Sequence, residues 1–169
     1  MKSEIYCILK NGDETMKLIK DENPMWDDNK KTIVEEGPFN LKNPEIGSPL
    51  EEEWWKLIDM DQNVLGYGWI TMENNDFEIS VAIHKNHQEL GLGTYILGEL
   101  EQIAKNRGFK ATVSVVRKKN DNSESIINWL CRKNYISHWL GIKGMEPKSK
   151  EFAINVVKKS DITLIKNLE

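Results

Sequence analysis

The chain has 169 residues, of which 39% are hydrophobic and 30% are charged, a balance typical of a folded globular protein. A chain of this length fits one domain, so we expect residues 1–169 to form a single domain. No apolar run approaches the roughly 20 residues of a membrane-spanning helix, and residues 1–4 lack the pattern of a secretion signal. We therefore expect a cytoplasmic protein with no membrane partner.

The charge balance and the cysteines exclude two further classes. The formal net charge of −4 repels nucleic acid, so no nucleic-acid partner is expected. The two cysteines, Cys7 and Cys131, lie far apart and outside any Cys-x-x-Cys pair. This usage suits a reducing cytosol and predicts neither a disulfide framework nor a zinc ribbon.

The first third of the chain begins with periodic segments and then becomes irregular. Apolar and polar residues alternate over residues 4–10, which predicts a strand, and a short helix is expected at 14–21. Residues 23–49 contain four of the five prolines. We interpret them as long loops around one short helix at 27–35, and such loops often form binding surfaces.

The centre of the chain combines a group of strands with a long helix. Short turns between three apolar segments predict an antiparallel meander. From residue 92 onward, apolar residues recur at the spacing of one helical face, and Gly108 is a natural end for that helix. The three strands are expected at 52–60, 63–72 and 77–84.

The last third of the chain is predicted to hold one more helix among strands. Asn122 or Ser123 can cap this helix, and Asn134 suits a left-handed residue at its end. The expected elements are a strand at 110–116, the helix at 122–133, strands at 136–142 and 152–158, and a loop at 144–150. The whole layout predicts a mixed α/β fold, with a twisted, mostly antiparallel central sheet of about seven strands flanked by about four helices.

The segment that carries chemistry is the turn before the long helix. Two glycines in it, Gly91 and Gly93, let backbone N–H groups point outward, and the helix N-terminus adds partial positive charge. Such a turn suits a phosphate or a pyrophosphate. The string Gln88-x-x-Gly91-x-Gly93 can also be no more than a tight turn, because composition alone produces it in roughly one of several chains of this length.

Two other nucleotide-binding motifs do not match. The dinucleotide fingerprint needs a small residue where Ile96 stands. It also needs an acidic residue about 20 positions further on, where the sequence has Thr112-Val113-Ser114. The phosphate-binding loop of NTPases needs Gly-Lys-Ser/Thr, which the sequence lacks.

The string Gln88-x-x-Gly91-x-Gly93, entered by Val81-Ala82-Ile83 and followed by a helix, resembles the acetyl-CoA signature of the GNAT N-acetyltransferases. The resemblance extends over most of the chain. The family runs strand, two helices, three-strand meander, helix, strand, helix and two strands, which is the order predicted above. The resemblance implies a GNAT-like acyl-CoA N-acyltransferase fold. It also implies transfer of an acetyl group from acetyl-CoA, as cosubstrate, to a primary amine.

The resemblance implies a place for each part of acetyl-CoA. In the family, the pantetheine arm pairs with the exposed strand before the motif, and the pyrophosphate lies on the N–H groups of the turn. An Asn at the start of the later helix often contacts the cofactor, although Asn122 can equally be a helix cap alone. The matching positions are Val81, Ala82, Ile83, Gln88, Glu89, Leu90, Gly91, Leu92, Gly93, Thr94, Asn122 and Ser125.

The turn departs from the family pattern at its start. The family usually has a basic residue and a glycine there, whereas this chain has Gln88-Glu89. A carboxylate near a pyrophosphate repels it unless Glu89 points to water. Lys85 and the basic residues 117–119 can supply compensating charge, or they can form a solvated face.

A second departure concerns the proton that goes to the departing CoA thiolate. Many family members supply it from a tyrosine near the end of the later helix, and no tyrosine matches here. Cys131 can act as a weak acid at that place, or it can be a small buried hydrophobic side chain. Tyr135 lies past the helix, where the family has a packing phenylalanine.

The resemblance implies direct attack of the amine on the thioester while both substrates are bound. By analogy, the N–H of Val81 is the candidate to stabilise the oxyanion. Glu78 is the candidate base, unless it is only the outward polar residue of an alternating strand. His84 and His138 are further candidates, each of which can instead be structural.

The acceptor is expected to be a small-molecule or peptide amine. Acidic residues at 27–28, 35–36 and 51–53 lie in the region that shapes the acceptor pocket in the family, and they would favour a cationic amine unless they serve solubility alone. No metal is expected, because His84 and His87 have no evident third ligand.

Two possibilities remain open at this stage. The alternative function is a catalytically degenerate module of the same fold that binds CoA or a protein partner. The strands near the C-terminus can also pair with a second copy, so the sequence allows a homodimer.

Overall fold

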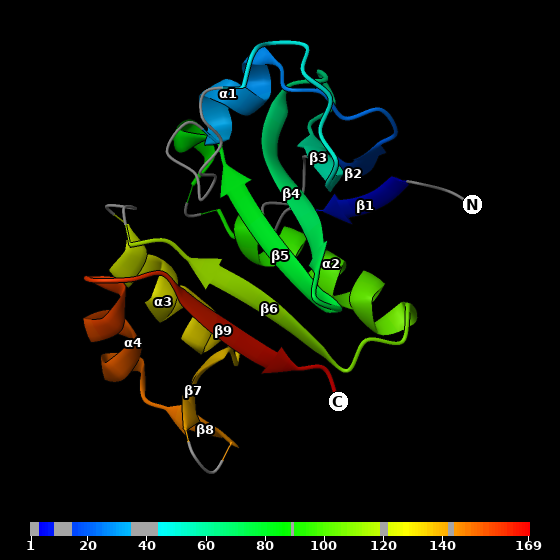
Figure 1. The fold of residues 1–169 in the computed structure, drawn as a ribbon. Helices are drawn as coiled ribbons and strands as arrows, with labels where there is room; N and C mark the ends of the chain where they lie inside the picture. The colour runs from blue at the N-terminus through cyan, green and yellow to red at the C-terminus, as the bar shows by residue number, and fades with distance from the viewer. Residues whose placement is uncertain (1–3, 9–14, 35–43, 89, 119–121, 142–143) are drawn as a thin grey trace. The chain divides into compact units, whose positions relative to one another are not determined.

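The computed structural model describes residues 4–8, 15–34, 44–88, 90–118, 122–141 and 144–169. These residues form nine strands, four α-helices and one 3₁₀ helix (Figure 1). They fall into two compact units: unit 1 lies within residues 1–71 and 79–100, and unit 2 within 72–78 and 101–169. Strand β5 (Asp76–Ile83) and helix α2 (Leu92–Asn106) contribute residues to both units.

Unit 1 is an antiparallel arrangement of strands in the order β1-β2-β3-β4-β5. Adjacent pairs from β1 to β4 are antiparallel, and β5 follows β4 through a hairpin. Besides the parts of β5 and α2, its elements are β1 (Glu4–Ile8), β2 (Thr15–Asp21), α1 (Asp28–Val34), β3 (Glu53–Ile58), β4 (Val64–Glu73) and the 3₁₀ helix η1 (Lys85–His87).

The core of unit 1 is built on aromatic side chains. Trp54 stacks on Trp69 with ring centroids 4.6 Å apart, and it meets the ring of Tyr67 edge-on at 5.7 Å. All three side chains are buried, and Ala82 of β5 packs against the same cluster. Alternation along β3 and β4 brings these rings to one face of the sheet.

Unit 2 places its strands in the order β5-β6-β9-β7-β8. Glu78 of β5 is paired in parallel with Val113 of β6. Strand β9 lies between β6 and β7 and is antiparallel to both. The elements are β6 (Ala111–Val116), α3 (Ser123–Arg132), β7 (Ile136–Gly141), β8 (Gly144–Lys148), α4 (Lys150–Val157) and β9 (Ile162–Asn167).

Much of the predicted layout is confirmed. The mixed α/β class, the mostly antiparallel pairing and the meander β3–β4–β5 are as expected. Gly108 and Asn134 follow their helices in the left-handed region, with φ of 88° and 70°.

The helix expected at 14–21 was wrong, because this segment is strand β2. Met16 and Leu18 are buried, with 1% and 0% of their surfaces exposed, and the residues between and beside them are only partly buried. This period of two fits a strand with one face on the core, and β2 pairs with both β1 and β3.

The strand expected at 152–158 was also wrong, because α4 occupies it. Ser149 caps this helix, its Oγ accepting a hydrogen bond from the N–H of Phe152 at 3.2 Å, and Ala153 and Val157 are buried one helical turn apart. Strands β8 and β9 were missed, and with β2 they bring the number of described strands to nine. None of the described helices is long and apolar enough to cross a bilayer.

Candidate functional site

The turn before α2 contains a glycine in the left-handed region of the backbone. Strand β5 ends at Ile83, and the next N–H, that of His84, donates to the carbonyl of Leu65 in β4 at 2.8 Å. Gly91 has φ of 80°, and its carbonyl accepts the first bond of α2, from the N–H of Tyr95 at 3.1 Å. The first N–H groups of a helix have no intrahelical partner, so this end of α2 can donate to an anion.

Two glycines of β4, which the sequence analysis did not single out, allow the elements on both sides of this turn to pack closely on β4. A β-carbon on Gly66 would lie 2.9 Å from the carbonyl oxygen of Ala82, so β4 and β5 approach closely there. A β-carbon on Gly68 would lie 2.5 Å from Cγ2 of Ile96, so α2 packs directly on β4. The signal was the Gly-x-Gly spacing inside a strand, where glycine often marks a close approach of main chains.

The side chain of Gln88 is engaged with the end of β5. Its Nε2 donates to the carbonyl oxygen of Ile83 at 3.2 Å, while Nδ1 of His84 accepts from the N–H of Asn86 at 3.1 Å. These contacts fold the segment after β5 back on the strand. They also assign His84 a structural contact at the start of η1.

The predicted cofactor residues of unit 1 lie along one continuous segment. Residues 81–83 are half-buried on β5, Leu90 and Gly91 are exposed, and Leu92 is buried as the anchor of α2. Gly93 and Thr94 belong to the first turn of α2 and are half-buried. Glu89 lies outside the described residues.

Glu78 belongs to unit 2 and is half-buried on β5. Burial raises the pKa of its carboxyl above the ordinary value of 4.5, and Glu73 and Asp76 raise it further, while Arg117 acts in the opposite direction. A carboxylate with a raised pKa accepts a proton more readily than an exposed one does, which suits a general base.

The other predicted residues of unit 2 lie on α3. Asn122 occupies the N-cap position, yet its side chain makes no capping hydrogen bond; Ser125 is exposed. Cys131 is half-buried near the end of the helix. Burial raises the pKa of its thiol, opposed by Lys150 and assisted by Glu151, so this thiol keeps its proton at neutral pH.

Tyr135 is a core residue of unit 2, with 1% of its surface exposed. Its hydroxyl lies 2.8 Å from Oγ1 of Thr112 and donates to Oε2 of Glu101 at 3.2 Å. Glu101 also pairs with Lys166 at 2.9 Å. Burial raises the pKa of this phenol. These contacts give Tyr135 a structural role in the core. Its position after α3, where the family has a packing phenylalanine, implied such a role.

Of the basic residues, Lys85 is exposed on η1, and Lys119 lies outside the described residues. Asp161 holds Arg117 with an Oδ2–Nη1 distance of 3.3 Å and accepts from the N–H of Lys118 at 2.9 Å. This pairing fixes the residues that follow β6. Among the described residues, no group of three or more metal-ligating side chains comes together.

Comparisons with solved structures give likenesses in fold at low sequence identity. An N-acetyltransferase from Staphylococcus aureus Mu50 is 14% identical with a TM-score of 0.49, over 70% of this chain and 68% of that one. The PaiA N-acetyltransferase of Thermoplasma acidophilum, solved in complex with coenzyme A, is 16% identical with a TM-score of 0.46, over 68% and 59%. The ribosomal-protein-S18-alanine N-acetyltransferase of Escherichia coli is 14% identical with a TM-score of 0.48, over 70% of each chain.

The sequence comparisons identify the family. No curated protein matches the chain. The model of the acetyltransferase (GNAT) family matches residues 16–127, which include the meander, the turn and all of α2. The match extends over more than half of the chain and confirms the resemblance seen in the motif. The chain belongs to the GNAT acetyltransferase family.

Proposed function

We propose that this chain transfers an acetyl group from acetyl-CoA to a primary amine. Family membership supports the reaction class, and the turn of residues 88–94 is the observation that carries the proposal. Apart from the two chain neighbours of Gly91, no described residue has an atom within 4 Å of the place where a β-carbon on Gly91 would stand. The main chain at the start of α2 is therefore open to a diphosphate, which the helix N-terminus would stabilise.

The residues that precede the turn fit the rest of the cosubstrate. Residues 81–83 are half-buried. Their remaining exposed surface can contact an extended pantetheine arm, although the strand is not fully exposed as a free edge. For the arm to bind at Ile83, the carbonyl of Ile83 would have to be free. The Gln88 side chain would therefore give up its hydrogen bond to this carbonyl and form one with the ligand. The family resemblance also makes Asn122, at the N-cap position of α3, a proposed cofactor residue.

Acetyl-CoA would supply an activated acyl group with a good leaving group, and the chain would supply the proton acceptor. As the amine nitrogen bonds to the carbonyl carbon and the carbon–sulfur bond breaks, one proton leaves the nitrogen. We assign its removal to Glu78, directly or through a water molecule. The raised pKa of this carboxyl matches the task better than that of an exposed glutamate.

Two further groups complete the proposed mechanism. The N–H of Val81 would stabilise the oxyanion that develops on the carbonyl. The thiol of Cys131, protonated at neutral pH because burial raises its pKa, would give its proton to the departing thiolate. We also propose that residues 1–169 form a single domain, which is supported by the match of one family model to residues 16–127.

A thiol-release assay with acetyl-CoA and a panel of primary amines tests this function. We expect release that depends on one class of amine, and a loss of about 100-fold or more in Glu78→Gln. Glu99→Gln is the matched control, because burial also raises the pKa of Glu99, yet no role is assigned to it. Binding of acetyl-CoA without thiol release for any amine would contradict the enzyme and support the non-catalytic module.

A further inference from the structure

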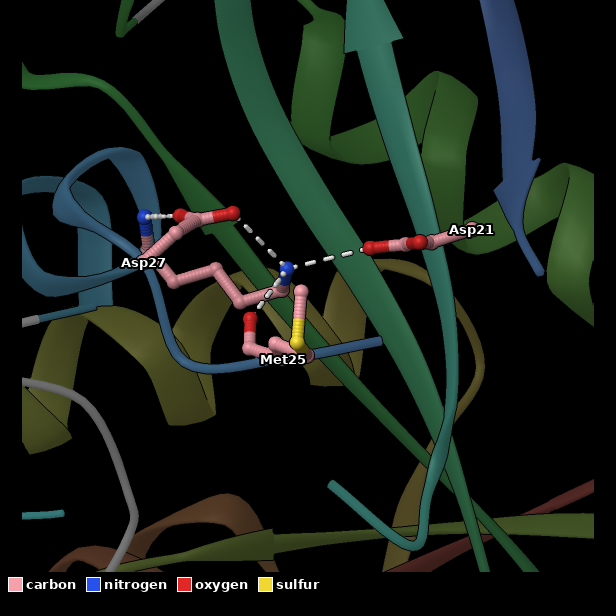
Figure 2. A network of polar contacts seen from close by, with 4 residues as sticks. Asp21, Met25 and Asp27 are labelled. Carbon is pink, nitrogen blue, oxygen red and sulfur yellow. Dashed lines mark hydrogen bonds and ion pairs between the residues drawn. The ribbon is translucent and has the colours of Figure 1, made fainter. Parts of the chain in front are cut away.

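A closed cluster of charges lies in unit 1, around the ammonium group of Lys30. This side chain is 1% exposed. It donates to Oδ2 of Asp21 at 3.1 Å, to Oδ2 of Asp27 at 3.2 Å and to the carbonyl of Met25 at 2.9 Å, as Figure 2 shows. Three oxygens satisfy its three donors, so we assign this cluster a structural role that ties α1 to β2.

A more open ion pair lies in unit 2, between Arg117 and Asp161. Nη1 of Arg117 lies 3.3 Å from Oδ2 of Asp161, and 34% and 39% of the two side chains are exposed. Strands β6 and β9 are antiparallel, with Val116 opposite Ile162, so the next position in this register sets Arg117 opposite Asp161. Oδ1 of Asp161 also accepts from the N–H of Lys118 at 2.9 Å. The carboxylate thus holds both the side chain of Arg117 and the main chain beside it.

Arg117 directly follows the strand that pairs with the proposed base. Strand β6 lies between β5 and β9, and Glu78 of β5 is paired in parallel with Val113 of β6. Paired residues of neighbouring strands project to the same face of a sheet, and so do alternate residues of one strand. Alternation from Val113, continued to the residue after β6, therefore sets Arg117 on the face of Glu78.

The charge of Arg117 reaches the carboxyl group of Glu78. Burial raises the pKa of this carboxyl, and Glu73 and Asp76 of the β4–β5 hairpin raise it further, while Arg117 lowers it. A nearby positive charge favours the ionised form of a carboxyl group. A general base has to be ionised to accept a proton, so Arg117 opposes the effect of burial in the direction that catalysis needs.

We propose that Arg117, held by Asp161, is a positioning residue for Glu78 and keeps this carboxyl group in the ionised form that accepts a proton from the amine. The proposal rests on the proposed function, because it concerns the base assigned there. Arg117 acts through Glu78 and not on the reacting atoms. The proton still passes from the amine nitrogen to the Glu78 carboxylate, directly or through a water molecule.

The first test is the pH dependence of acetyl transfer in Arg117→Gln. Without the positive charge, the midpoint below which the rate falls should move to a higher pH than in the unaltered chain. At a pH below that midpoint, the rate relative to that at pH 8 should fall by about twofold or more. Arg117→Lys keeps the charge and should restore the unaltered profile. Equal midpoints in Arg117→Gln and the unaltered chain would overturn the proposal.

Lys118→Gln is the matched control, because it removes the same charge from the next residue, which is exposed. Lys118 binds Asp161 through its N–H, which glutamine retains, so the midpoint should stay that of the unaltered chain. A midpoint that moves as far in Lys118→Gln as in Arg117→Gln would show a general effect of net charge and would overturn the proposal.

Asp161→Ala tests whether Asp161 holds Arg117 for this task. Loss of a negative charge by itself would lower the midpoint, whereas release of Arg117 from its place would raise it. We expect a higher midpoint than in the unaltered chain. An equal or lower midpoint would overturn the role of Asp161.

A second measurement needs no catalysis. In the chain labelled with ¹³C-glutamate, the carboxyl signal of Glu78 can be assigned from its loss in Glu78→Gln, and its titration can be followed without acetyl-CoA. The midpoint of this titration should be higher in Arg117→Gln than in the unaltered chain. Equal midpoints would overturn the proposal.

The titration separates this proposal from the proposed function. A higher midpoint in Arg117→Gln without thiol release for any amine would contradict the proposed function and leave the action of Arg117 on Glu78 supported. Amine-dependent thiol release with an unchanged titration in Arg117→Gln would contradict the role of Arg117 alone.

Discussion

Gly68 of β4 and Ile96 of α2 are in direct contact, so close that a β-carbon on Gly68 would lie 2.5 Å from Cγ2 of Ile96 and 2.7 Å from Cδ1 of Leu100. Both of these side chains are fully buried. The close contact sets how near the start of α2 lies to β4. The end of β5 is fixed to the same strand through the bond from His84 to Leu65. Glycine at position 68 thus helps to position the candidate diphosphate turn.

Gly68→Ala should destabilise the chain by about 1–3 kcal/mol, because a methyl group must be accommodated in a packed interface. The control is Gly98→Ala, on the exposed face of α2, where no described atom beyond the nearby backbone of the helix lies within 4 Å of the added carbon. That change should stabilise the chain by up to about 1 kcal/mol, since alanine is the better helix former. Urea unfolding measures both. A neutral Gly68→Ala would show that α2 does not depend on this close contact.

Glu78→Gln should stabilise the folded chain at neutral pH, in addition to its effect on the reaction. The folded-state pKa of Glu78 is raised above its ordinary 4.5, so the folded chain binds this proton more tightly than the unfolded chain does. The resulting stabilisation is present below pH 4.5 and is lost as pH rises through the folded value. Glutamine stays neutral throughout.

Urea unfolding at two pH values measures this difference. The variant and the unaltered chain should have similar stabilities at the acidic limit, and the variant should be the more stable at pH 8. The rate of acetyl transfer by the unaltered chain should also fall with acidification, at a midpoint above 4.5. A stability difference that does not change with pH would contradict the assignment of Glu78 as a half-buried titrating group.

Tyr135→Phe should cost about 1–3 kcal/mol in free energy of unfolding, because Glu101 and Thr112 each lose a buried partner. Thiol release by the folded variant should stay within a factor of about two, since the change leaves the proposed proton donor Cys131 in place. Cys131→Ala should show the opposite pattern, with slower thiol release and a smaller loss of stability. A large loss of rate in Tyr135→Phe would contradict this assignment and indicate that Tyr135, and not Cys131, donates the proton.

Local patterns predicted the parts of the fold that depend on nearby residues. The turn at Gly91, the apolar face of α2 and the helix ends at Gly108 and Asn134 each follow from a few consecutive residues. The segment now seen as β2 was misread because a short apolar segment fits either period. Strand β9 was missed because its place is set by pairing with β6 and β7, far away in sequence.

In the candidate site, too, only the parts formed by consecutive residues could be predicted from the sequence. The turn motif and the strand before it stand in one continuous segment, so sequence located both. The contact of Tyr135 with Glu101 joins residues 34 positions apart, and only the folded chain brings them together. Lys30 gave no sequence signal, because a lysine in a polar segment is normally exposed.

The central claim is that the turn before α2 binds the diphosphate of acetyl-CoA, and thermal unfolding with and without this compound tests it most directly. At 100 times its dissociation constant, acetyl-CoA should add about 2.7 kcal/mol of stability to the unaltered chain. Gly98→Trp, on the exposed face of α2, should keep this gain, and Gly91→Trp should lose it because the indole blocks approach to the main chain. An equal gain in Gly91→Trp, or none in the unaltered chain, would contradict the account.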